Sequence, residues 1–166
     1  MYRVAAVHLI CGAIGAGKTT YSIALALRTG AIRLSMDDWM QNLFFRDRPD
    51  PHGIAWFLER TARCEVQMWD LTEAIIERGV DVVLDVGLAR LEDRDRCRGR
   101  GMQTKGTVKL HYLDVDVETR RARVRLRNVE RAGTEALQVT DAMFDFMERW
   151  FEPPTDDELY GAMIVG

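Results

Sequence analysis

Short apolar runs alternate with longer amphipathic or charged segments along this chain. The apolar runs end at turn residues and predict strands at residues 4–10, 32–35, 81–86, 108–113 and 161–165. The segments between them predict helices at residues 19–28, 54–78, 91–100, 117–131 and 140–150. This alternation predicts an α/β fold with a five-stranded, mainly parallel sheet that helices cover on both faces.

One long segment, residues 37–80, separates the second and third predicted strands. Its Pro and Gly residues at positions 47–53 predict a loop before the helix at 54–78. An insertion at this place in the chain is expected over the carboxyl ends of the strands, where open α/β sheets bind their ligands. Because the sequence contains no internal repeat and no linker, we expect residues 1–166 to form a single domain.

The bulk properties favour a globular protein of the cytoplasm. The 166 residues suffice for one sizeable core, and no apolar run approaches the roughly 18 residues of a membrane span. The first strand follows almost directly on Met1, so neither a secretory signal nor a membrane partner is expected. The net charge of −3 gives nucleic acid no overall attraction. Three scattered cysteines show neither disulfide nor metal-ligand spacing and are expected to be buried thiols: Cys11, Cys64 and Cys97.

Residues 12–19, Gly-Ala-Ile-Gly-Ala-Gly-Lys-Thr, fit the pattern of a phosphate-binding loop between the first strand and the first helix. Glycines let such a loop wrap a phosphate chain, and the helix N-terminus adds positive potential. We expect Lys18 to hold the β- and γ-phosphates of ATP and the Thr19 hydroxyl to ligate Mg²⁺. The predicted nucleotide-binding residues are Gly12, Ala13, Ile14, Gly15, Ala16, Gly17, Lys18, Thr19 and Thr20.

Two acidic positions follow predicted strands and are candidates for the chemistry. Asp85 ends the third strand, where a carboxylate binds Mg²⁺ directly or through water, or else caps the next turn. Asp37 and Asp38 follow the second strand, on the side where the γ-phosphate is expected. One of them can accept the proton of an attacking hydroxyl, although Ser35 or Asp37 can also simply start a helix. We favour Asp37 as the base, with Asp38 as an orienting or capping residue.

Charge is unevenly distributed in the last third of the chain. Six arginines crowd residues 120–131, and acidic residues dominate residues 141–158. The arginine run is typical of a solvated amphipathic helix, or of a segment from which one or two arginines face the triphosphate. The charged helix at 91–100 is expected to be exposed. Two histidines are expected in the core or at a sheet edge and a third on the acceptor side: His8, His111 and His52.

Four motifs together resemble small P-loop kinases of the zeta-toxin, chloramphenicol-phosphotransferase and polynucleotide-kinase type: residues 12–20, 35–38, 83–85 and 123–128. The resemblance spans nearly the whole chain and implies a three-layer P-loop NTPase fold like that of nucleoside kinases. It also implies ATP- and Mg²⁺-dependent transfer of the γ-phosphate to a hydroxyl acceptor. Asp37 matches the residue that activates this hydroxyl, and Arg123 or Arg127 matches the arginine of a lid at about 118–133. Arg127, followed by Asn128, is the closer match to the polynucleotide-kinase lid.

One departure from the family pattern bears on the acceptor. Polynucleotide 5′-kinases of this type carry an arginine three residues after the catalytic aspartate, where this chain has Met40, and Arg46 or Arg48 is the nearest substitute. A small-molecule or nucleotide-like acceptor is therefore favoured over nucleic acid. A polynucleotide 5′-hydroxyl kinase and a nucleotide-dependent switch with a protein partner are the alternatives. The aromatic residues of the insertion line an acceptor pocket or belong to the core: Trp39, Phe44, Phe45, Trp56 and Phe57.

Overall fold

The computed structural model describes residues 4–49, 53–130 and 138–166. Its strands are β1 (Ala6–Cys11), β2 (Ile32–Ser35), β3 (Val82–Asp85), β4 (Thr107–Leu113) and β5 (Met163–Val165). Its helices are α1 (Lys18–Thr29), α2 (Met36–Leu43), the 3₁₀ helix η1 (Phe45–Asp47), α3 (Ile54–Ile76), α4 (Leu91–Gln103), α5 (Val117–Glu130), α6 (Asp141–Trp150) and α7 (Asp156–Leu159). The predicted strands and helices lie within about three residues of these bounds, whereas α2 and α7 go beyond the prediction.

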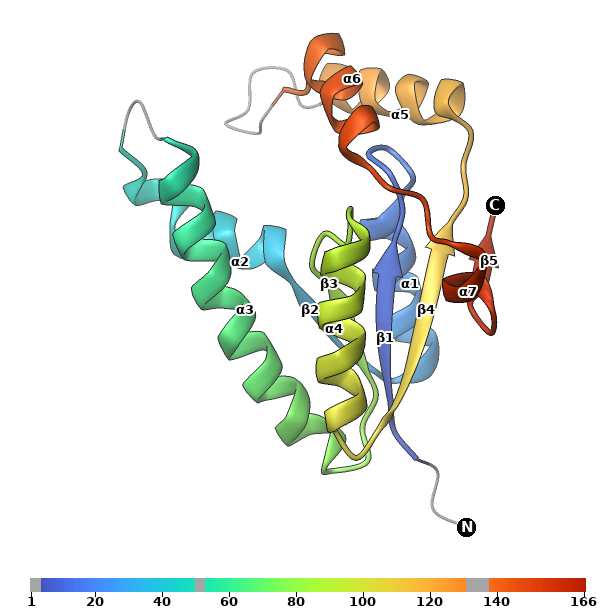
Figure 1. Cartoon of the computed structure of the whole chain (residues 1–166). Helices are drawn as coiled ribbons and strands as arrows, with labels where there is room; N and C mark the ends of the chain where they lie inside the picture. The colour runs from blue at the N-terminus through green and yellow to red at the C-terminus, as the bar shows by residue number, and fades with distance from the viewer. Residues whose placement is uncertain (1–3, 50–52, 131–137) are drawn as a thin grey trace.

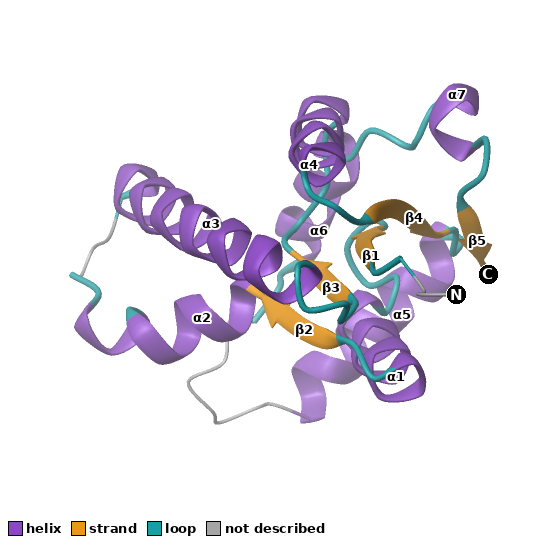
Figure 2. Ribbon diagram, turned by 90° about the horizontal axis from the view of Figure 1, so that it is seen from below, coloured by secondary structure: helices purple, strands orange, loops and turns teal. Residues whose placement is uncertain are grey.

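The five strands form one parallel sheet in the order β2-β3-β1-β4-β5. β1 lies at its centre, and successive side chains of this strand point to opposite faces. Val7 and Leu9 pack in a cluster with residues of α3 and α4, whereas Ile10 packs with residues of α1. Figures 1 and 2 show these helices on the two sides of the sheet. The prediction of a three-layer α/β fold with a parallel sheet is confirmed.

The insertion between β2 and β3 consists mostly of a helix of the core. The buried side chains of α3 recur at helical spacing and form one stripe: Cys64, Met68, Trp69, Thr72 and Ile76. At the start of the same helix, Ile54 and Leu58 are exposed. The C-terminal half of α3 therefore covers the sheet, while α2, η1 and the first turns of α3 extend beyond it and correspond to the predicted acceptor side (Figure 1).

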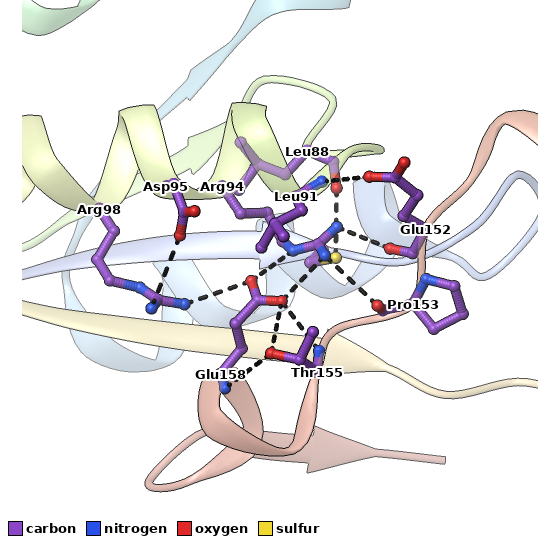
Figure 3. Close-up of polar contacts among 10 residues, drawn as sticks. Leu88, Leu91, Arg94, Asp95, Arg98, Glu152, Pro153, Thr155 and Glu158 are labelled. Carbon is purple, nitrogen blue, oxygen red and sulfur yellow. Dashed lines mark hydrogen bonds and ion pairs between the residues drawn. The ribbon is translucent and has the colours of Figure 1, made fainter.

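Helix α4 corrects one expectation. Its charged sequence predicts an exposed helix, but Arg94 is only 1% exposed and Cys97 is also buried. The guanidinium of Arg94 donates to both carboxylate oxygens of Glu158, at 2.7 and 3.0 Å, and to the carbonyl of Glu152 at 2.8 Å (Figure 3). These acceptors offset the cost of removing the arginine from water. Ligands from the C-terminal tail thus explain why a charged side chain lies inside the fold.

The C-terminal tail ends in α7 and β5, at the edge of the sheet. Thr155 and Glu158 cap α7 reciprocally, since each side chain accepts a hydrogen bond from the other residue's backbone N–H. The three cysteines are free and buried, as predicted. Among the residues that the structure describes, no helix combines the length and the apolar character that crossing a membrane requires.

Candidate active site

The phosphate-binding loop joins β1 to α1 at the carboxyl end of the sheet (Figure 1). Gly15 and Gly17 have φ angles of +78° and +94°, a region that other residues rarely adopt. A Cβ atom at Gly15 would lie 2.5 Å from the carbonyl oxygen of Arg120, so this loop packs closely against α5. Gly17 precedes α1 and offers no side-chain cap, which leaves the first N–H groups of the helix open to an anion. The loop therefore has the shape and the donors that a phosphate chain requires.

Lys18 begins α1, and its side chain turns back over the loop. Its Nζ donates to the carbonyl oxygens of Gly12 at 2.8 Å and Ala13 at 3.1 Å. Burial lowers the pKa of Lys18, while the negative charges of Asp85 and Asp37 act in the opposite direction. The ammonium group thus lies over the loop and within electrostatic range of both candidate carboxylates.

Asp85 ends β3 beside the first turn of α1. Its Oδ2 accepts hydrogen bonds from the Ser22 hydroxyl at 2.9 Å and from Nη2 of Arg33 at 2.8 Å. The Ser22 hydroxyl also lies 2.9 Å from the carbonyl of Thr19. Thr19 and Thr20 are exposed at the start of the same helix. The Asp85 carboxylate is therefore linked through Ser22 to the backbone of α1 at Thr19.

The two adjacent aspartates of α2 have different surroundings. Nη1 of Arg33 donates to Oδ2 of Asp38 at 2.6 Å, and the Asp38 backbone N–H donates to the Ser35 hydroxyl, which caps α2. The Asp37 carboxylate has no hydrogen-bond partner in the described part of the chain. Desolvation and the negative charge of Asp85 raise the pKa of Asp37, although its side chain keeps contact with solvent. Asp37 is thus the available carboxylate of the two, and a raised pKa makes it a better proton acceptor.

Two arginines of α5 contact the phosphate loop. Nη1 of Arg123 donates to the carbonyl of Ala16 at 3.2 Å, and Nη1 of Arg120 lies 3.4 Å from the carbonyl of Ile14. Arg127, the other arginine predicted for the lid, lies one helical turn further along α5 and is half-buried. Of the two lid candidates, Arg123 is therefore the one whose contact with the loop is described.

Ion pairs join arginines of α5 to acidic residues of α6. The pairs, with closest N···O distances of 2.5, 2.7 and 3.1 Å, are Arg120–Glu148, Arg121–Asp145 and Arg125–Asp141. The arginine run and the acidic run noted in the sequence thus hold two helices together above the loop. Residues 131–137, which include the end of the predicted lid and Arg131, lie outside the described residues.

The aromatic residues of the acceptor side are partly buried and pack against the core, which favours the packing interpretation: Trp39, Phe44, Phe45, Trp56 and Phe57. The guanidinium of Arg60 lies 4.4 Å from the ring centre of Trp56 and 6.0 Å from that of Phe44, which links α3 to the end of α2. Met40 is only 1% exposed, so its position belongs to the core. His52 lies outside the described residues.

His8 and His111 belong to a buried polar chain below the site, in agreement with their predicted core location. Nδ1 of His8 and Nε2 of His111 are 2.8 Å apart, and Nδ1 of His111 is 2.8 Å from the Tyr21 hydroxyl. Nε2 of His8 faces Oδ2 of Asp81 at 3.4 Å. Burial and the neighbouring His8 lower the pKa of His111 to about 4. These hydrogen bonds connect the residue before β3 with β1, β4 and α1, so they are part of the scaffold rather than of the reacting site.

Sequence reasoning missed three residues that shape the site: Ser22, Arg33 and Arg120. Ser22 and Arg33 hold Asp85, and Arg120 braces the phosphate loop. One signal was available for Arg33, because a charged residue within a strand of a covered parallel sheet needs a partner nearby. Nothing in the sequence distinguishes Ser22 or Arg120 from other polar residues on their helices.

The sequence matches the AAA_33 family, described as an AAA domain, over residues 7–154. The chain belongs to this family. Among curated proteins, none matches the sequence significantly. The P-loop kinase-like character predicted from the four motifs is confirmed, and a fold of this kind implies nucleotide binding.

Solved structures show the same fold at low sequence identity. A sugar kinase from Janibacter sp. HTCC2649 is 17% identical with a TM-score of 0.63, over 98% of this chain and 85% of that one. Kti12 from Chaetomium thermophilum, in complex with ADP-AlF3, is 14% identical with a TM-score of 0.67, over 96% and 87%. A chain of the Pnkp1/Rnl/Hen1 RNA repair complex is 18% identical with a TM-score of 0.63, over 92% and 48%.

Proposed function

We propose that this protein is an ATP- and Mg²⁺-dependent kinase that transfers the γ-phosphate to a hydroxyl group of a small-molecule or nucleotide-like acceptor. Residues 1–166 act as one domain, with the acceptor side at about 37–80 and the lid at about 118–133. One observation carries the proposal: the ammonium of Lys18 lies over the phosphate loop, and Asp37, which follows β2 at the carboxyl end of the same parallel sheet, has a carboxylate without a hydrogen-bond partner in the described part of the chain.

The proposed transfer requires a proton acceptor and positive charge around the moving phosphoryl group. The acceptor hydroxyl oxygen forms a bond to the γ-phosphorus, the bond from this phosphorus to the bridging oxygen breaks, and ADP leaves. The hydroxyl proton passes to Asp37. Lys18 and Arg123 stabilise the charge on the phosphoryl oxygens, with Arg127 as a second arginine of the lid. Arg33 supports the assignment of Asp37, because it pairs with Asp38 and leaves its neighbour available.

The groups beside the loop fit a magnesium ion by their chemistry. The Thr19 hydroxyl and the Asp85 carboxylate are hard oxygen donors, and Ser22 links the Asp85 carboxylate to the backbone carbonyl of Thr19. Arg33 and Ser22 bind only one oxygen of Asp85, so the other remains for a metal or its water. A bound Mg²⁺ supplies charge neutralisation on the phosphates. The positions of the loop and of the Asp37 carboxylate follow from the fold of the protein and do not require the ion.

The test is transfer from γ-labelled ATP in the presence of Mg²⁺ to a broad panel of hydroxyl compounds. Asp37→Asn should reduce transfer by about 10²–10⁴-fold, because the proton acceptor is lost, and leave ATP affinity within about twofold. Asp38→Asn is the matched control and should retain most of the activity. Lys18→Ala should weaken both ATP binding and transfer. Labelling of no compound, or equal losses in the two aspartate variants, would contradict the proposal.

A polynucleotide 5′-hydroxyl kinase is the second candidate, because a chain of an RNA repair complex shares the fold. The buried Met40, in place of an arginine, argues against it. An oligonucleotide with a free 5′-hydroxyl belongs in the same panel and decides between the two. A nucleotide-dependent switch would instead hydrolyse ATP slowly, and the rate would rise with one protein partner. Efficient transfer to a small acceptor argues against such a switch.

A further inference from the structure

A polar cavity of about 360 Å³ opens on the acceptor side, at the junction of α2 and η1. Its lining combines two arginines, two amides and one aromatic ring: Gln41, Asn42, Phe45, Arg46 and Arg48. This volume falls at the lower end of the range of about 300–1,000 Å³ that is typical of small-molecule sites. The residues that line the cavity are positively charged or neutral, and none of them is acidic.

The two arginines of the cavity are available to a ligand. In the parts of the chain that the structure describes, neither the Arg46 nor the Arg48 guanidinium has a carboxylate partner. The guanidinium of Arg48 lies over the ring of Phe45, 5.7 Å from its centre, which restrains the side chain beside the cavity. By contrast, Arg120 and Arg121 are paired with acidic residues of α6. Two unpaired guanidinium groups at one polar cavity favour the binding of an anion.

The cavity lies next to the predicted proton acceptor along the same helix. Gln41 follows Asp37 by four residues, so the two share one face of α2 about 6 Å apart along the helix axis. Figure 1 shows α2 running from the carboxyl end of β2 toward the start of α3, away from the sheet. A small molecule that places a hydroxyl group at Asp37 can therefore extend another part of itself toward Arg46 and Arg48.

We infer that the acceptor carries an anionic group, a carboxylate or a phosphate monoester, which Arg46 and Arg48 bind while its hydroxyl faces Asp37. Gln41 and Asn42 supply amide donors and acceptors for further hydroxyl groups of the same molecule. This inference rests on the proposed kinase function and specifies the chemical class of its acceptor. The reaction is the transfer described above, with ATP as donor and ADP as the leaving product.

The experiment uses acceptors in matched sets of three: a neutral polyol, the corresponding sugar acid and the corresponding phosphate monoester. Transfer from Mg²⁺-ATP is expected for the acid or the phosphate ester and not for the neutral polyol, and the arm that reacts identifies the anionic group. The Arg46→Ala/Arg48→Ala double variant should raise the KM for this acceptor at least about tenfold, with kcat within about twofold. Arg78→Ala removes an exposed arginine beyond the other end of α3 and should behave like the wild type.

Calorimetric binding of the same compounds separates a failure of this inference from a failure of the proposed function. If no compound is phosphorylated, yet the anion binds to the wild type and to Asp37→Asn but not to the double variant, the anion site stands and the kinase function fails. If the neutral polyol reacts as well as its acid, or if the double variant keeps the wild-type KM, the function stands and the anion site is wrong. If none of the anions binds, the anion site is wrong as well.

Discussion

The phosphate loop and the acceptor side are built in different ways. The loop is held by glycines in left-handed conformations, by Arg120 and Arg123 of α5, and by the buried end of β1 below it. The acceptor side carries exposed polar residues on α2 and η1, joined to α3 mainly by partly buried aromatic rings. Backbone geometry thus fixes the loop that members of a P-loop family share, whereas exposed side chains shape the surface at which we propose that the acceptor binds.

Among these variants, removal of the Arg94 side chain should cause the largest loss of stability. Cys11, the residue before the loop, donates from its thiol to the carbonyl of Leu88 at 3.3 Å, and Arg94 lies beside this thiol. Arg94→Ala leaves the buried Glu158 with only the longer contact to Arg98, at 3.3 Å, and its hydrogen bonds to Thr155, which should lower the free energy of unfolding by about 3 kcal/mol. Urea denaturation measures this loss. Arg96→Ala, which removes the half-exposed ion pairs of this arginine with Glu65 of α3 and Asp93 of α4, should cost only about 0–1 kcal/mol.

A fall in pH should lower the stability of the fold through His111, which lies beneath the loop. The folded protein holds the pKa of His111 at about 4, below its ordinary value of about 6.5, so folding favours the neutral ring. Its contribution to stability is complete above about pH 6.5 and is lost as the pH falls toward 4, by about 3 kcal/mol in all. Unfolding curves at pH 7, 5.5 and 4 measure the effect. His111→Gln cannot titrate, and an identical pH dependence in this variant would exclude the histidine as the cause.

Alanine in place of a glycine of the loop should separate the effect of a steric clash from that of backbone strain. Gly15→Ala forces a side chain into a left-handed conformation and against the Arg120 carbonyl, at a cost of about 1–3 kcal/mol. It should also weaken ATP binding at least about tenfold, because the loop must shift. Gly30→Ala is the matched control, since its φ is +71° but no atom lies within 4 Å of the added Cβ. This variant should cost about 1 kcal/mol and leave ATP affinity unchanged.

The smallest effect is expected on the acceptor side. Arg60→Ala removes a cation–π contact with Trp56 and a longer one with Phe44, worth about 0.5–1 kcal/mol. Thermal denaturation measures the loss, and ATP affinity should not change. A loss as large as that of Arg94→Ala would remove the contrast between the two regions.

The sequence predicted what depends on local pattern. The strands and long helices follow from apolar periodicity, and the phosphate loop follows from glycine, lysine and threonine at fixed spacing. Arg123 contacts the loop at the carbonyl of Ala16, and its role at the triphosphate stays a prediction. For these elements the residues that determine the structure are close together in the chain, so periodicity and spacing carry enough information.

The sequence did not predict what depends on distant partners. Arg33 holds Asp85 from 52 positions away, and Arg94 holds Glu158 from 64. A charged residue in a helix is usually solvated, so the charged pattern of α4 predicts exposure. The acceptors that bury Arg94 come from Glu152 and Glu158 of the C-terminal tail, which the pattern of α4 does not contain. Helix α7 differs, because its start is visible in the sequence: Thr155 and Glu158 have the spacing of a capping box. The cavity beside Arg46 requires the turn at η1, which periodicity does not specify.

Calorimetric titration with ATP in the presence of Mg²⁺ examines the loop on which the proposed chemistry depends. We predict one nucleotide bound per wild-type chain, and an affinity at least about tenfold lower in Lys18→Ala, because the ammonium group over the loop is lost. If the wild type takes up no purine nucleoside triphosphate, or if Lys18→Ala binds ATP equally well, the loop does not hold a triphosphate as proposed.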